Sequence, residues 1–219
     1  MSDNTESVLL DYLSRLRTTT DVVRLLGDPE ERRLLDVFVD MDVAASDERR
    51  TPILGDLLRR PLEQERDEDE AGDGARAELL LELSARTDRG GSGVITASRT
   101  LELGPRVLLT GVAGAGKTTL LRWLASEVAR SAELVPIWVP HLPLLGDDLA
   151  AELSALAAAA VEMPADDAVR AALAEAIVAG RAQLLLDGLD EAPDETQRTL
   201  LARLGALGPA VRVIVATRP

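Results

Sequence analysis

The feature that most constrains the fold is a set of four short apolar runs separated by helix-like segments. The runs are RVLLT (106–110), LVPIWVP (134–140), AQLLLD (182–187) and VRVIVATRP (211–219). Each is an almost unbroken apolar stretch of strand length, which is typical of strands buried on both faces of a sheet. The segments between them are predicted to be helices, at 117–130, 149–163, 166–180 and 195–207. Strands that alternate with helices predict an α/β fold with a parallel sheet flanked by helices.

The first 93 residues differ from the rest in pattern. Helical spacing over 6–17 predicts a helix, and the threonines after it are expected to cap a second short apolar segment, 21–27, that closes at Gly27. Alternation of apolar and acidic residues over 34–43 predicts a strand with one wet face. We therefore expect a small helix and strand segment over 1–45. An acidic linker over 46–93 follows, with a helix at 75–86.

Composition excludes several classes of protein. The formal net charge of −14 argues against a nucleic-acid-binding protein, because phosphate affinity depends on clustered Lys and Arg. The absence of cysteine excludes disulfides and thiolate metal sites. No apolar run approaches the roughly 20 residues that a membrane helix needs, and the N-terminus lacks the pattern of a signal peptide. We expect a cytoplasmic protein with no membrane partner.

A glycine-rich turn directly after the first predicted strand carries the strongest chemical signal. GVAGAGKTT (111–119) fits the pattern G-x-x-x-x-G-K-[ST] and opens a helix. Its glycines allow backbone N–H groups to point at phosphate oxygens, and the helix N-terminus adds positive potential. Lys117, the chain's only lysine, offers a compact charge to the β- and γ-phosphates. The hydroxyl of Thr118 is suited to Mg²⁺.

The stretch LLLDGLDEAP (184–193) supplies the acids. Asp187 ends a predicted strand, and ligands of parallel α/β sheets bind at the carboxyl ends of the strands. Asp187 is therefore predicted to hold Mg²⁺ together with Thr118. Asp190 and Glu191 follow in the turn, and either could orient a water for attack on the γ-phosphate. Arg218 ends the last strand, within reach of the same phosphate.

These motifs resemble the NACHT family of STAND-type P-loop NTPases, which are related in architecture to AAA+ proteins. The resemblance rests on GVAGAGKTTLLRWLA, LVPIWVPHLPLL, LLLDGLDEAP and VRVIVATRP in this order. It covers most of 94–219, and more weakly 1–45. Its most specific element is D-G-L-D-E, in which a small residue follows the magnesium aspartate.

The resemblance implies roles for individual residues of a nucleotide-binding domain over 94–219. Asp190 would direct the water with support from Glu191, Arg218 would be the sensor, and Thr118 and Asp187 would hold the metal. The cofactors implied are ATP and Mg²⁺. The nucleotide contacts implied are Gly111, Val112, Ala113, Gly114, Ala115, Gly116, Lys117, Thr118 and Thr119.

The family pattern continues beyond the sensor strand with another strand, a helical domain and a winged-helix domain. We therefore expect this chain to be a fragment, or a domain that needs a partner chain. One side of the strand at 106–110 would be open unless the N-terminal segment covers it, and an open edge is an aggregation hazard.

The function expected from the resemblance is a slow ATPase that acts as an oligomerisation switch in signalling, which in a bacterium suggests defence against phage. A homo-oligomer is expected on activation. Two alternatives stay open. One is an ATP-driven motor with rapid turnover, and the other is an interaction module that nucleotide only stabilises. His141 is expected to be an ordinary loop residue, and Trp123 and Trp138 are expected to lie in the core.

Overall fold

The computed structural model describes residues 3–24, 30–34, 42–44, 94–131, 133–143, 146–164 and 167–219. The chain divides into two compact units, Met1–Val39 with Leu101–Pro219, and Asp40–Thr100. In the second unit β3 (Asp42–Ala44) pairs antiparallel with β4 (Val94–Thr96). The 3-10 helix η1 (Ala97–Glu102) follows β4, and its last two residues belong to the first unit. Most of the strand predicted at 34–43, and all of the linker and helix predicted over 46–93, lie outside the described residues.

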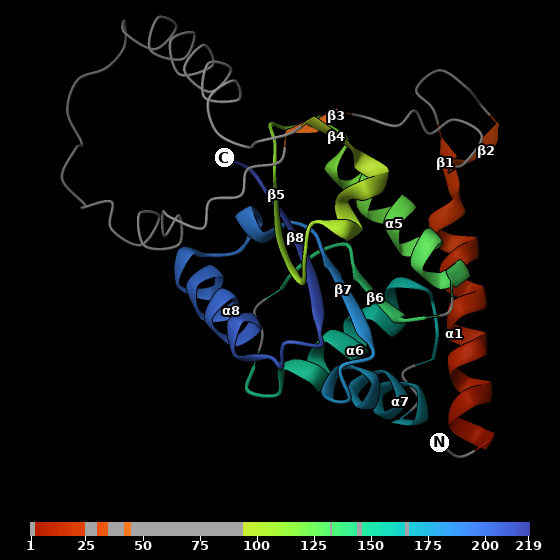
Figure 1. The fold of residues 1–219 in the computed structure, drawn as a ribbon. Coiled ribbons are helices and arrows are strands. Elements are labelled where there is room, and N and C mark those ends of the chain that lie inside the picture. Colours follow the sequence, from red (N-terminus) through yellow and green to blue (C-terminus); the bar gives the residue numbers. More distant parts are fainter. Residues whose placement is uncertain are drawn as a thin grey trace, which may run out of the picture. The chain divides into compact units, whose positions relative to one another are not determined.

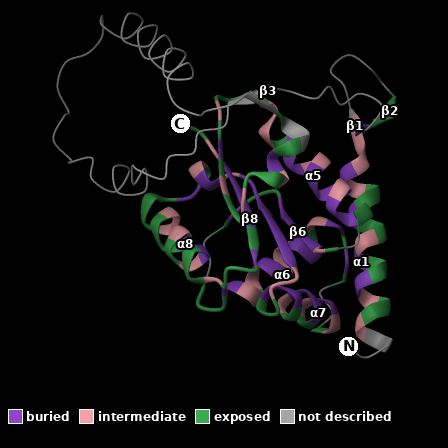
Figure 2. Ribbon diagram, viewed as in Figure 1, coloured by how far each residue is buried: buried purple, intermediate pink, exposed green. Residues whose placement is uncertain are grey.

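A four-stranded parallel sheet organises the first unit (Figure 1). Its strands are, in spatial order, β5 (Arg106–Thr110), β8 (Arg212–Thr217), β7 (Ala182–Leu186) and β6 (Val135–Val139). All residues of β6 and β7 are buried, whereas β5 buries only Leu109. Figure 2 shows this burial along β6. The predicted parallel α/β sheet is confirmed, with β5 as an edge strand among the described residues.

Four helices follow the strands in the predicted order. They are α5 (Lys117–Ser131), α6 (Leu149–Ala160), α7 (Asp167–Val178) and α8 (Asp194–Ala206). Helices α5 and α6 pack against β6, and α7 packs against β6 and β7. The carboxylate of Asp148 caps α6 by accepting from the N–H of Ala151 at 3.0 Å. Soon after α6 ends, Glu162 adopts a positive φ of 54°, so the helix predicted to reach 163 is shorter.

The N-terminal helix α1 (Asp3–Asp21) extends beyond the predicted 6–17 and packs against α5 and α7. Tyr12 is fully buried, and its hydroxyl donates to the carbonyl oxygen of Pro136 in β6 at 2.8 Å. Burial raises the pKa of Tyr12 well above its ordinary value. Helix α1 is thus part of the same core as the sheet.

The threonines near residue 20 do not cap a second segment, so that prediction is wrong. They lie inside α1, where the hydroxyl of Thr20 donates to the carbonyl oxygen of Leu16 at 2.7 Å. The helix ends at Asp21, and the chain continues as β1 (Val22–Arg24), which pairs antiparallel with β2 (Glu31–Arg33). The guanidinium of Arg122 in α5 donates to the carbonyl oxygens of Thr19 and Val22. A cation therefore binds one carbonyl of the last turn of α1 and the first carbonyl of β1.

Among the helices that the structure describes, none combines the length and the apolar character needed to cross a membrane.

Candidate nucleotide-binding site

The glycine-rich loop joins the end of β5 to the start of α5. Gly114 and Gly116 have φ values of +77° and +81°, which other residues rarely adopt. The N–H of Ala115 donates to the carbonyl oxygen of Val112 at 3.2 Å. For the N–H groups of Ala113, Gly114 and Gly116, the described part of the chain offers no acceptor. Unpaired amides of this kind, placed before a helix N-terminus, form a concave site for an anion.

The ammonium group of Lys117 lies against this loop. Its Nζ donates to the carbonyl oxygens of Gly111 at 2.6 Å and Val112 at 3.1 Å. An ammonium group has three donors, so at least one remains for a further acceptor. Lys117 is the first residue of α5, so its charge lies where the loop amides are concentrated.

A direct hydrogen bond joins the two predicted metal ligands. The hydroxyl of Thr118 donates to Oδ2 of Asp187 at 2.5 Å, although the two residues are 69 positions apart. Asp187 is 7% exposed and directly follows β7, and its Oδ1 accepts from the N–H of Gly188 at 3.0 Å. The sheet therefore brings the second residue of α5 and the end of β7 into contact.

Gly188 allows the sharp turn after Asp187. Its φ is +78°, in the left-handed region that disfavours other residues. A Cβ at this position would lie 3.5 Å from Oε2 of Glu191, which is ordinary contact, so backbone conformation rather than space requires the glycine. The turn leads into the 3-10 helix η2 (Leu189–Glu191), which carries Asp190 and Glu191.

Asp190 and Arg218 form a two-contact pair at the carboxyl ends of β7 and β8. Oδ1 of Asp190 accepts from the backbone N–H of Arg218 at 3.2 Å, and Oδ2 lies 3.0 Å from Nε of its guanidinium. The Asp190 side chain is 22% exposed, and that of Arg218 is 57% exposed. The predicted water-directing acid and the predicted sensor residue therefore contact each other.

Glu191 lies beside a residue that sequence reasoning assigned no role. Nδ1 of His141, just after β6, is 3.0 Å from Oε2 of Glu191. His141 occupies an exposed loop, as expected, but the sheet order β7–β6 places that loop next to η2. The only available signal was its position at the carboxyl end of a strand.

The remaining predicted contacts lie in the loop or directly after it. Val112, Ala113 and Ala115 are exposed in the loop, and Thr119 is exposed in the first turn of α5. Trp138 is buried in β6 as predicted, whereas Trp123 is only half-buried.

The residues present suit a phosphate chain and a magnesium ion. The loop offers unpaired amides and a lysine, and Thr118 and Asp187 offer two oxygen ligands on one side of it. Mg²⁺ commonly takes one or two protein oxygens and completes its shell with phosphates and waters.

Comparison with known families gives an independent result for the same region. Residues 105–219 match the NACHT domain, a span that holds the whole parallel sheet, the loop, Asp187 and Arg218. No curated protein and no solved structure matched the chain. The family match covers more than half of the 219 residues. The chain therefore belongs to the NACHT family, and residues 105–219 form its nucleotide-binding P-loop NTPase domain.

Proposed function

We propose that this protein binds ATP with Mg²⁺ and hydrolyses it slowly, and that its nucleotide state controls self-assembly. The observation that carries the proposal is the 2.5 Å hydrogen bond between Thr118 and Asp187. It joins the helix that follows the phosphate loop to the acidic strand end. The family supplies the preference for ATP, because a phosphate loop does not read the base.

Each residue of the site has a distinct task in this proposal. The unpaired amides of the loop and Nζ of Lys117 bind the phosphates, and Lys117 exchanges one loop carbonyl for a phosphate oxygen. Thr118 and Asp187 hold the magnesium ion, which when bound offsets charge on the phosphates. Gly188 turns the chain, so that the carboxylates nearest the γ-phosphate are those of Asp190 and Glu191. No acid stands directly after Asp187.

The contact between Asp190 and Arg218 supports a switch role. Both carboxylate oxygens of Asp190 interact with Arg218. Each oxygen can accept a further hydrogen bond, so Asp190 can orient a water while it stays bound to Arg218. A change at Arg218, directly after β8, therefore also changes the position of the water-directing acid. That linkage is what a nucleotide switch needs, because a conformational signal must differ between nucleotide states.

The edge strand supports an assembly role. Among the described residues β5 pairs only with β8, and Leu108 in β5 is 39% exposed. A strand at the edge of a sheet, with unpaired N–H and C=O groups along one side, is a template for a further strand. We propose that another segment or a partner chain completes this edge, and that activation leads to a homo-oligomer.

Calorimetric titration with ATP and Mg²⁺ tests the binding step. Lys117→Ala should abolish measurable binding, because the ammonium group and the amides act on the same phosphates. Its melting temperature without nucleotide should stay close to that of the wild type, which shows that the variant is folded. Unchanged ATP affinity in a folded Lys117→Ala variant would contradict the assignment of the phosphate-binding site.

Phosphate release tests the hydrolytic step. Asp190→Ala should keep nucleotide binding and lose phosphate release. If hydrolysis persists, the role belongs to Glu191 or to neither acid.

The rate of turnover separates the switch from the alternative functions. A turnover well above about one per second, nearer to typical enzymes, would favour a motor over a switch. If nucleotide raises the melting temperature but no phosphate is released and Asp190→Ala does not change assembly, the interaction module is the better description.

A further inference from the structure

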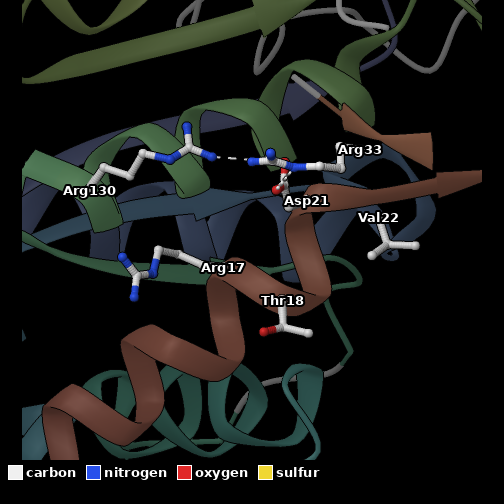
Figure 3. Close-up of a pocket in the computed structure, with 6 residues that line it drawn as sticks. All are labelled: Arg17, Thr18, Asp21, Val22, Arg33 and Arg130. Carbon is white, nitrogen blue, oxygen red and sulfur yellow. Dashed lines mark hydrogen bonds and ion pairs between the residues drawn. The ribbon is translucent and has the colours of Figure 1, made fainter. Parts of the chain in front are cut away.

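A second cluster of charged residues lies where α1 gives way to β1 and α5 ends. A cavity of about 400 Å³ there is lined by Arg17, Thr18, Asp21, Val22, Arg33 and Arg130. Figure 3 shows that these residues come from α1, the two short strands and α5. Three arginines and one carboxylate thus line the cavity, in a chain whose net charge is −14.

The local ion pairs do not neutralise the three guanidinium groups. Asp21 accepts from Nε of Arg33 at 3.1 Å, and its other oxygen lies 3.8 Å from Arg130. Arg130 also pairs with Glu127. Arg17 is exposed, and its side chain has no hydrogen bond or ion pair within the described residues. Arg17, Arg33 and Arg130 therefore face two carboxylates, which leaves an excess of one positive charge at the cavity.

Asp21 itself shows that the cluster is incomplete. Its Oδ1 atom is buried and has no hydrogen-bond partner, because Arg130 is too distant to donate to it. A buried polar atom without a partner is uncommon and calls for an explanation. A water that donates one hydrogen to this oxygen and the other to an acceptor on a bound group would supply one.

We propose that this cavity binds a small molecule through a phosphate or diphosphate group. Guanidinium groups bind phosphate oxygens with paired N–H donors, which makes arginine the preferred residue for such sites. The volume lies within the range of small-molecule pockets, about 300–1,000 Å³. It therefore has room for more than a single phosphate.

The cavity is separate from the phosphate loop but shares a helix with it. Lys117 is the first residue of α5, and Arg130 lies in its last turn. At the rise of an α-helix, the two positions are about 20 Å apart. A ligand that binds Arg17 of α1 and Arg130 of α5 would link the N-terminal segment to the helix that carries the phosphate loop.

Titration of the full chain with pyrophosphate tests the proposal. The Lys117→Ala background is used, so that the phosphate loop does not contribute. We expect saturable binding that Arg17→Gln weakens by about tenfold or more. Arg15→Gln is the matched control, because Arg15 lies on the same helix but pairs with Asp11; it should change the affinity by less than about twofold.

A second variant distinguishes a ligand site from arginines that only offset the negative potential at the C-terminal ends of α1 and α5. Asp21→Asn removes the competing carboxylate and should tighten pyrophosphate binding several-fold, provided that its melting temperature shows a folded chain. No saturable binding, or equal weakening by Arg15→Gln and Arg17→Gln, would overturn the proposal. ATP binding by an otherwise wild-type Arg17→Gln variant should be unaffected, so this test and that of the nucleotide site fail independently.

Discussion

At the scale of single residues, the turn after β7 is governed by backbone conformation. Gly188 holds a φ of +78°, and this allows Asp187 to end the strand while Asp190 reaches Arg218. The D-G-L-D-E pattern therefore has a physical cause: an acid directly after Asp187 would have to adopt a left-handed conformation.

Replacement of this glycine gives the first residue-scale prediction. Gly188→Ala should lower the free energy of unfolding by about 1–2 kcal/mol, because alanine is strained at this φ. Gly205→Ala is the control, since Gly205 lies within α8 and a Cβ there has open space. It should stabilise the protein by about 0.5–1 kcal/mol. Urea denaturation measures both, and equal effects of the same sign would contradict the argument.

The pair between His141 and Glu191 gives a second residue-scale prediction. Both side chains are largely exposed, at 65% and 50%, so their interaction is worth at most about 1 kcal/mol. His141→Ala should lower hydrolysis by no more than about fivefold at unchanged nucleotide affinity. His141→Asn keeps a donor near the position of Nδ1 and should restore most of the rate. If the hydrolysis rate of His141→Asn is no higher than that of His141→Ala, the contact with Glu191 does not contribute to hydrolysis.

At the scale of elements, α1 behaves as part of the nucleotide-binding unit. It packs on α5 and α7, and Tyr12 reaches across to β6. Arg122 of α5 meets the C-terminal end of α1, and burial lowers the pKa of that guanidinium. The helix that carries Lys117 is therefore buttressed by residues far upstream in the chain.

The attachment of α1 can be measured through one hydroxyl. Tyr12→Phe should lower the free energy of unfolding by about 1–3 kcal/mol, because the Pro136 carbonyl loses a buried donor. Leu10→Ala, on the same helix but 62% exposed, should change it by less than about 0.5 kcal/mol. If α1 is not docked, Tyr12→Phe will resemble Leu10→Ala in chemical denaturation.

The same tyrosine predicts a dependence on alkaline pH. Burial raises the folded-state pKa of Tyr12 above the ordinary 10.0. Above that value the unfolded chain loses the proton while the folded chain keeps it. Stability should therefore fall as pH rises, by up to about 1.4 kcal/mol per unit, until the folded-state pKa is reached. Tyr12→Phe should show a shallower loss between about pH 9 and about pH 11, and parallel curves would exclude this cause.

At the scale of the whole molecule, nucleotide should stabilise the unit that contains the sheet. Ligand at about 100 times its dissociation constant adds about 2.7 kcal/mol if it binds only the folded state. ATP with Mg²⁺ should therefore raise the melting temperature of the wild type and leave that of Lys117→Ala unchanged. A rise in both proteins would place the stabilising interaction outside the phosphate loop.

Much of the molecule could be predicted from local pattern. The four strands and four following helices were predicted within a few residues, because apolar runs and helical spacing act over short distances. Tertiary packing overrode the pattern at Thr18–Thr20, where α1 continued because its partner helix binds the exposed carbonyls at its end. Local capping preferences are worth only about 1 kcal/mol and yield to such packing.

The sequence by itself determined the class of sheet, the phosphate loop and the acidic residues after the strand at 182–187. Each of these depends on residue types at fixed short spacing. Only the tertiary structure decided which of those residues touch. Thr118 meets Asp187, Asp190 meets Arg218 and His141 meets Glu191, across separations in the sequence of 69, 28 and 50 residues. The strand order sets these contacts, because parallel strands that are distant in the chain end side by side at one edge of the sheet.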